Sequence, residues 1–332
     1  MSKIKQVFLI TIIVCIGKSS FAQFTTTGGN ITQSTTGNVG IGILTPTAPL
    51  SLLEVKNGSV LFDGTTGTTP ISGAGTRMMW VPAKGAFRSG VVTSTFFDDV
   101  NVGINSFGCG FNTLASGGNS FSCGSNTKAS GAYSFSSGYL TISSGNGGSF
   151  TTNTGTTASG TASSSFGYYT KAESFSSFVI GRYNNISATY NTTSWVATDP
   201  LFVIGNGTNA ASRNNALTVL KNGNILIDKI TQVNSTYKLD VNGKIRASEI
   251  VVNTTGADFV FEKNYELMPL DVLEQKIKAD KHLPEIASAE EMQTNGVGLS
   301  ELNTKLLQKT EELTLYIIEL NKRIERLENK NK

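Results

Sequence analysis

The side chains that could carry out chemistry are few in this 332-residue chain, and they do not form a known catalytic set. His282 is the only histidine, and it lies far along the sequence from Cys109 and Cys123. A nucleophilic serine or cysteine needs a base beside it, usually a histidine. Hydrolytic triads and Cys–His pairs are therefore disfavoured.

Paired carboxylates and metal ligands are equally scarce. Asp98 and Asp99 are the one suggestive pair for glycan cleavage, which uses two carboxylates, but adjacent aspartates also occur in turns. Between residues 106 and 181 the only acid is Glu173, too little for zinc or for calcium-binding repeats. We predict no catalytic residues, no metal site and no cofactor, and hence a non-enzymatic protein.

Charge also limits the partners. The net charge is +3, and only 15% of the residues are charged. Proteins that bind nucleic acid concentrate Lys and Arg on one face, which this composition does not favour. We therefore predict no nucleic-acid partner.

The N-terminus predicts export. Two lysines precede an apolar run over residues 7–16, and Ser20-Phe21-Ala22 follows as a small-x-small cleavage site. The run is shorter than the about 20 residues that span a bilayer. We predict a signal peptide over residues 1–22, no membrane span after its removal, and a secreted or cell-surface protein.

The middle of the chain repeats in units of fourteen residues, such as "SFSCGSNTKASGAY" at residues 120–133. The repeat runs from residue 106 to 184, with one residue, Gly148, inserted. Three columns keep phase: Phe107, Phe121, Phe135, Phe150 and Phe178 at the second position, Gly110, Gly124, Gly138, Gly167 and Gly181 at the fifth, and Thr113, Thr127, Thr141, Thr156 and Thr170 at the eighth.

A period this short predicts a β-solenoid, in which each unit is stabilised by stacking on copies of itself. Fourteen residues suffice for two short strands and two turns. In one unit, Phe121 and Cys123 would face one side and Ser120 and Ser122 the other. The alternative is a flexible Gly/Ser linker or stalk, but such a segment has no reason to place phenylalanine in phase.

Cys109 and Cys123 occupy the same position of adjacent units. Stacked strands would place their Cα atoms about 4.8 Å apart, within the range of a disulfide. Export favours oxidation. In-register neighbours can also fail to reach the torsion that the bond needs, so a disulfide and two buried thiols both remain open.

The repeat unit resembles the fourteen-residue repeat of trimeric autotransporter adhesin heads, which reads roughly Ser-apolar-Ala-apolar-Gly and then a polar segment. The resemblance covers about residues 106–184. It implies a left-handed parallel β-roll that forms a homotrimer and binds host surfaces, through glycans or proteins. Ser122 and Ser136 stand where the family usually has alanine.

A second, weaker repeat flanks the first. Leu53-Glu54-Val55 and Leu239-Asp240-Val241 each precede an Asn-Gly pair, and each follows another short apolar segment. Alternating residues around Asn-Gly predict a β-hairpin at each place. We interpret these segments as small β modules on either side of the roll.

The last part of the chain changes character and predicts a coiled coil. Leucine recurs every seven residues over residues 299–332, and the residue four positions after each leucine forms the second column of the same helix face. With leucine at d, isoleucine at a favours two strands, whereas the head resemblance implies three. A helix packed on its own chain is the alternative. The seam comprises Leu299, Asn303, Leu306, Thr310, Leu313, Ile317, Leu320, Ile324 and Leu327.

Before this helix, Ser288 and Glu291 form a capping box that predicts a short helix ending near Asn295-Gly296. The surrounding region resembles the C-terminal region of secreted bacterial fibre-like proteins and, more distantly, the intramolecular chaperone of phage endosialidases and tail spikes. The resemblance implies trimerisation, and in many members self-cleavage at a serine. Ser248 fits that serine by position alone, so we do not expect self-cleavage.

The sequence therefore predicts a mainly β protein: a left-handed parallel β-roll with flanking β modules and a C-terminal coiled coil, assembled as a homotrimer. The predicted function is that of an exported adhesin, and a tail-spike-like fibre that binds or cleaves glycans is the alternative. The expected parts are a signal peptide (1–22), N-terminal β modules (23–105), the roll (106–184), β connectors (185–250), a chaperone-like region (251–298) and the coil (299–332).

Overall fold

The computed structural model describes residues 24–27, 30–33, 39–41, 53–55, 59–232 and 234–331. The predicted signal peptide lies outside the described residues. The chain divides into two compact units, Met1–Gly243 and Lys244–Lys332. Each unit is described by itself below.

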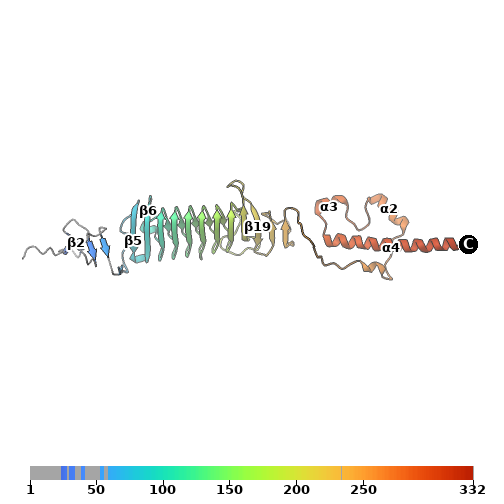
Figure 1. Ribbon diagram of the computed structural model, residues 1–332, viewed down its shortest axis with the longest axis horizontal. Coiled ribbons are helices and arrows are strands. Elements are labelled where there is room, and N and C mark those ends of the chain that lie inside the picture. The colour runs from blue at the N-terminus through green and yellow to red at the C-terminus, as the bar shows by residue number, and fades with distance from the viewer. Residues whose placement is uncertain are drawn as a thin grey trace, which may run out of the picture. The chain divides into compact units, whose positions relative to one another are not determined.

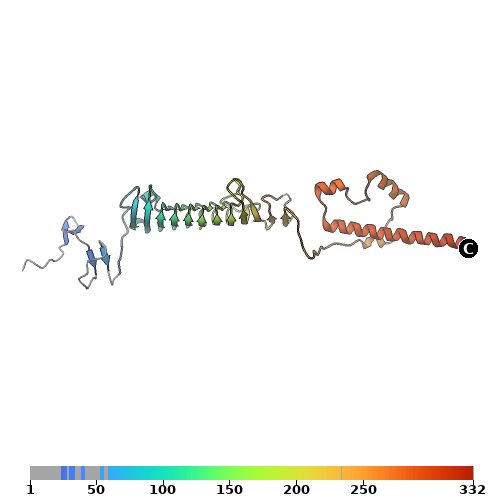
Figure 2. The same ribbon diagram turned by 45° about the horizontal axis from the view of Figure 1, so that its top comes forward.

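The first unit is built around one long sheet of twelve strands (Figure 1). From β6 to β18 its strands lie side by side in chain order, as Figure 2 also shows. The strands are β5 (Gly75–Val81), β6 (Ala86–Val92), β7 (Phe107–Phe111), β9 (Phe121–Ser125), β11 (Phe135–Tyr139), β13 (Phe150–Thr154), β15 (Ser164–Tyr168), β17 (Phe178–Arg182), β18 (Pro200–Asn206), β19 (Asn215–Leu220), β20 (Ile225–Ile227) and β21 (Leu239–Val241).

A second sheet of five two-residue strands completes each turn of the chain, and all its pairs are parallel. These strands alternate in the sequence with those of the long sheet. They are β8 (Leu114–Ala115), β10 (Lys128–Ala129), β12 (Ile142–Ser143), β14 (Thr157–Ala158) and β16 (Lys171–Ala172).

The register of the long sheet confirms the repeat. Phe107 pairs with Phe121, and Phe121 with Phe135, so partners are fourteen residues apart. At the inserted residue the partner of Phe135 is Phe150, fifteen residues on. The chain is thus a parallel β-solenoid. Parallel pairing continues beyond residues 106–184, through β6 at one end and β18 at the other.

Each turn has two tight corners, where the backbone conformation or the lack of space disfavours most side chains. Asn112 and Asn126 adopt positive φ at one corner and Asn119 at the other, a conformation that Asn tolerates better than most residues. Gly124 has a φ of 121°, and a Cβ there would lie 2.2 Å from the Gly138 carbonyl oxygen. Close backbone approach between turns therefore favours glycine in this column, where Asn153 is the one exception.

The interior of the roll is small and polar rather than aromatic. Serine at the first and third positions, threonine at the eighth and alanine at the tenth are buried in successive turns. The hydroxyl groups bond to each other across the interior: Ser122 Oγ lies 2.7 Å from Thr127 Oγ1, and Ser165 Oγ lies 2.9 Å from Thr170 Oγ1. The predicted alternation is confirmed, with the serine side as the inside. Most of the interior hydroxyl groups thus find partners within the roll, as buried polar groups generally do.

A buried arginine closes the N-terminal end of this interior. Arg88 is fully buried, and its guanidinium donates to the carbonyl oxygens of Ser106 and Ala115. Gly108 replaces the serine of other turns because a Cβ there would lie 3.0 Å from Arg88 Cδ. Thr113 consequently lacks the hydroxyl partner that Ser122 provides for Thr127, and its Oγ1 has no hydrogen-bond partner within the described residues.

Apolar cores lie towards the ends of the solenoid. At the N-terminal end, the 3₁₀ turn Pro82–Lys84 joins β5 to β6, and a second 3₁₀ turn, Asp99–Asn101, follows β6. This part of the chain buries Met79, Val81, Ala86, Val92, Phe97 and Val102. Near the C-terminal end a smaller cluster contains Ala158, Ala172, Val179 and Val203. These clusters cover the turns whose open faces would otherwise meet water.

The flanking modules repeat the solenoid pairing instead of forming hairpins. β3 (Val39–Ile41) pairs in parallel with β4 (Leu53–Val55), and β20 pairs in parallel with β21. Both registers join residues fourteen apart, as in Val39↔Leu53 and Ile225↔Leu239. The hairpins predicted at Asn-Gly were therefore wrong, because the preceding segment supplies the partner. A true antiparallel pair lies earlier, between β1 (Phe24–Thr27) and β2 (Asn30–Gln33).

The second unit is helical. After a 3₁₀ turn (Asp258–Phe261) come α2 (Leu270–Asp280), α3 (Ala289–Asn295) and the long α4 (Leu299–Lys330). The capping box is confirmed: the Ser288 side chain accepts from Glu291 N, and Glu291 accepts from Ser288 N. Gly296 follows as the C-cap. Within the described residues, no helix is both long and apolar enough to cross a membrane.

Candidate functional site: the Phe ladder and the leucine seam

Phenylalanine rings form a continuous stack on the outer face of the long sheet. Neighbouring ring centroids are 4.5–5.9 Å apart, and six of the seven pairs are stacked. Stacked aromatic pairs contribute about 0.5–1.5 kcal/mol each beyond burial. This stack, here the Phe ladder, comprises Phe87, Phe107, Phe121, Phe135, Phe150, Phe166, Phe178 and Phe202.

The Phe ladder extends the predicted column at both ends and repairs its gap. Ser164 breaks the column in sequence, but Phe166, two residues later on the same strand, stacks between Phe150 and Phe178. Alternate residues of a strand point to the same face, so this replacement keeps the ring on the outside. Phe87 and Phe202 were missed because they lie outside the repeat; their register with Phe107 and Phe178 identifies them.

Much of this outer face is accessible. Phe107 and Phe178 are 36% and 41% exposed, and Phe111, Tyr139 and Tyr168, at the sixth position, are also exposed. At the N-terminal end, Phe87 borders an apolar groove of about 660 Å³ lined by Leu61, Phe62, Met78 and Trp80, among others. Contiguous exposed apolar surfaces are typical of interaction sites.

The two cysteines lie on the same face, one on each of two adjacent strands. Cys109 and Cys123 are directly paired, and their Sγ atoms are 2.8 Å apart as free thiols. Burial, with a further contribution from Cys123, raises the pKa of Cys109 to about 12. The Cys109 thiol is therefore held in its unreactive protonated form, although the Cys123 sulfur lies beside it.

This environment predicts slow alkylation. At pH 8 we expect iodoacetamide to modify Cys109 about a hundredfold more slowly in the reduced native chain than in urea, because the thiolate is the nucleophile. Peptide mass spectrometry at timed intervals measures both rates. Equal rates in the native and unfolded chains would contradict the structure.

The predicted seam of α4 is exposed along its whole length. Its leucines and isoleucines, from Leu299 to Leu327, are 47–65% exposed, and Asn303 and Thr310 are exposed as well. A different face of α4 packs against its own chain, where Gln308 and Tyr316 are buried. The helix thus makes its intrachain contacts without covering the leucine seam.

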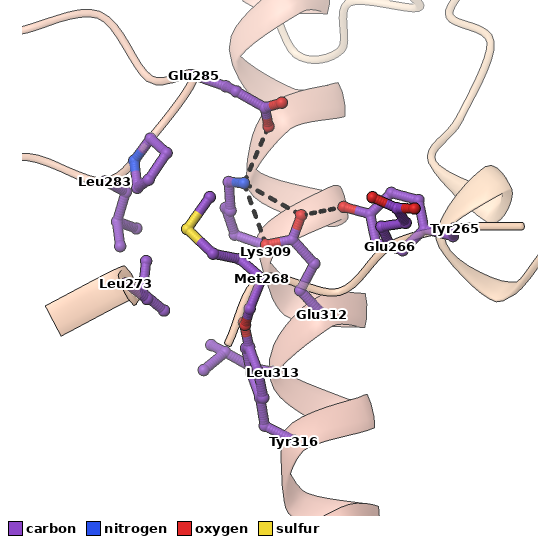
Figure 3. A pocket seen from close by; sticks show the side chains of 11 residues that line it. Tyr265, Glu266, Met268, Leu273, Leu283, Glu285, Lys309, Glu312, Leu313 and Tyr316 are labelled. Atoms are coloured by element: carbon purple, nitrogen blue, oxygen red, sulfur yellow. Dashed lines mark hydrogen bonds and ion pairs between the residues drawn. The ribbon is translucent and has the colours of Figure 1, made fainter. Parts of the chain in front are cut away.

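A polar cluster attaches the preceding segment to α4 beside a cavity of about 220 Å³ (Figure 3). Lys309 Nζ lies 3.0 Å from Glu285 Oε2 and 3.1 Å from Glu312 Oε2, and the Tyr265 hydroxyl donates to Glu312. Tyr316 donates to the Met268 carbonyl oxygen. The cavity lies between these polar contacts and apolar side chains, so it belongs to the packing of this unit.

The electrostatics of this cluster predict acid sensitivity. Burial raises the pKa of Glu312, but hydrogen bonds from Tyr265, Gln308 and Lys309 outweigh it and leave the pKa below its usual value. A carboxylate with a depressed folded-state pKa stabilises the fold above its unfolded pKa and loses that contribution as pH falls. Hydrogen exchange over residues 258–268, corrected for intrinsic rate, should therefore accelerate between about pH 5 and pH 3.

Glu312→Gln is the matched control for this titration. It keeps the shape of the side chain but removes the ionisable group, so its exchange should be flat across the same pH interval. A wild-type profile that is equally flat would show that the carboxylate does not hold the segment.

The remaining sequence candidates take structural positions. Asp98 accepts from Gly73 N at 2.7 Å, and Asp99 pairs with Lys84 at 3.2 Å, so both hold the segment before β5 and the turn after it. His282 bonds through Nδ1 to the Leu283 carbonyl oxygen. Ser248 is exposed outside helices and strands. Among the described residues no cluster of three or more His, Cys, Asp or Glu could hold a metal ion.

Comparison with known proteins identifies no relative of this chain. No protein-family model, no curated protein and no solved structure matches the chain. The fold defines the chain as a parallel β-solenoid with a C-terminal helical unit.

Proposed function

We propose that this chain is an exported, fibre-like adhesin that associates with two further copies of itself. The Phe ladder joins the solenoids, and the leucine seam of α4 joins the helices as a coiled coil. The assembled solenoid surface then binds glycans or proteins outside the cell, and no catalytic step is involved.

The observation that carries this proposal is where the apolar side chains lie. The solenoid interior is already filled with Ser, Thr and Ala, so the Phe ladder has no place inside its own chain. The leucine seam is likewise left open by α4. Between residues 106 and 184 the charged residues are Lys128, Lys171, Glu173 and Arg182, so little charge opposes association of this face.

Three chains are favoured over two by the resemblance of the repeat to trimeric adhesin heads. Isoleucine at the a positions Ile317 and Ile324 would favour a dimer in a simple coil. Asn303 and Thr310 interrupt that pattern, since polar residues at a set register and oligomer number. The head and the coil must have the same stoichiometry within one fibre, so the number of chains that the head resemblance implies applies to both.

Adhesion itself can be tested with beads that carry the full mature chain. We expect such beads to be retained on mucin-coated glass and to wash off albumin-coated glass, with albumin-coated beads as the control. No reducing sugar should be released from the mucin. Equal retention on both coatings would refute the adhesin, and sugar release would favour a glycan-cleaving fibre.

A further inference from the structure

A buried lysine at the C-terminal end of the solenoid has no ordinary partner. Lys221 follows β19, and its side chain is 0% exposed; the side chain of Asp199 is 7% exposed. Lys221 Nζ lies 3.9 Å from Asp199 Oδ2, too far for a hydrogen bond. In the part of the chain that the structure describes, this nitrogen has no hydrogen-bond partner. A buried ammonium in this state is costly.

The surroundings exclude water from this pair. Lys221 Nζ lies 5.8 Å from the ring centre of Phe175 and 5.4 Å from that of Trp195. The loop over residues 185–199 covers it, and this loop is fastened to the solenoid by the Phe175 N bond to the Asn191 carbonyl oxygen, 2.8 Å. Burial lowers the pKa of Lys221, and Asp199 opposes this shift only in part. Burial therefore weakens the preference of this side chain for its charged form.

The backbone holds the two side chains together. Lys221 N donates to the Asp199 carbonyl oxygen at 3.0 Å, and Asn222 N donates to the Ala197 carbonyl oxygen at 2.9 Å. Asn191 N donates to Asp199 Oδ2 at 2.9 Å, which orients the carboxyl group. Fixed reactants of this kind have effective concentrations far above those in solution.

Two further titratable groups at this end of the solenoid are shifted towards their protonated forms. Burial raises the pKa of Glu173, although Lys171 and Arg213 partly oppose it. Burial and then the charges of Glu173 and Asp199 raise the pKa of Tyr190.

We propose that Lys221 and Asp199 join in an intramolecular isopeptide bond. The ammonium first passes a proton to the carboxylate, which gives an amine and a carboxylic acid. The amine lone pair then attacks Asp199 Cγ, a C–N bond forms, and one C–O bond breaks. The leaving hydroxyl takes the second amine proton and departs as water. No oxidant or reductant is needed, and two buried charges become one neutral amide.

Peptide mapping of the full chain tests this bond directly. The protein is denatured and digested with trypsin, which cuts after Lys and Arg. We expect peptide 183–213 to be linked to peptide 214–229, with a mass one water below the sum and no cleavage after Lys221. Fragment ions should place the link on Asp199 and Lys221. Recovery of linear peptides ending at unmodified Lys221 from folded protein would overturn the proposal.

Three variants and one internal pair sharpen the test. Lys221→Arg and Asp199→Ala should abolish the linked peptide, whereas Asp199→Asn should still form it with loss of ammonia in place of water. Lys229 and Asp240 serve as the internal control: they are closer, at 2.7 Å, but their side chains are 21% and 13% exposed. They should stay unlinked, because hydrated charged groups do not condense.

Discussion

Gly131→Ala should destabilise the solenoid by about 2–3 kcal/mol, although it adds one methyl group. A Cβ at Gly131 would lie 2.1 Å from the Gly145 carbonyl oxygen on the next turn, and backbone cannot rotate away as a side chain can. The stacked turns would have to separate locally or shift register. Guanidinium unfolding followed by circular dichroism measures the loss.

Gly118→Ala is the matched control. Gly118 also has an ordinary φ, but a Cβ there has no neighbour within 4 Å. Its stability should stay within about 0.5 kcal/mol of the wild type. Similar losses for both variants would mean that the flexibility of glycine, rather than close approach of the turns, explains the glycine at position 131.

Ile317→Asp should dissociate the assembled chain, and Ile318→Asp should not. Ile317 lies on the leucine seam and is 65% exposed, whereas its neighbour Ile318 lies off the seam and is 45% exposed. In an assembled coil, the aspartate at 317 is buried without a partner and costs about 2 kcal/mol or more per chain. The two variants have the same composition and net charge.

Sedimentation equilibrium over a range of concentrations measures this difference. The Ile317→Asp chain should show a lower mass at each dilution than the Ile318→Asp chain, with α4 still helical in both. Identical masses would contradict the assignment of the seam to chain association.

The repeat was predictable because equivalent positions in successive turns of a solenoid carry similar residues at a fixed spacing in the sequence. Phase alone indicated the parallel register, the glycine corners and the alternation of Phe121 with Ser122. Which side is buried did not follow, since phenylalanine is the more apolar residue and would be expected inside. The roll is too thin for aromatic rings, and the hydroxyl pairs, such as Ser122 with Thr127, fill it instead.

The ends of the solenoid were less predictable because they depart from the period. Arg88 precedes the first repeat, and its effect on Gly108 and Thr113 follows only from packing. Lys221 and Asp199 lie beyond the last repeat, at the two ends of the β18–β19 hairpin. No periodicity describes this hairpin or the loop before it. The Asn-Gly hairpins failed because local turn propensity competed with parallel stacking, and stacking prevailed.

The mass of the mature protein by sedimentation equilibrium, compared with a chain truncated before Leu299, tests the central claim most directly. We expect the mature protein to have three times the mass of one chain. We expect the truncated protein to associate more weakly, so that it is already dissociated at concentrations where the mature protein is still assembled. A monodisperse monomer in both cases would contradict the trimeric fibre, and the Phe ladder and leucine seam would then need another partner.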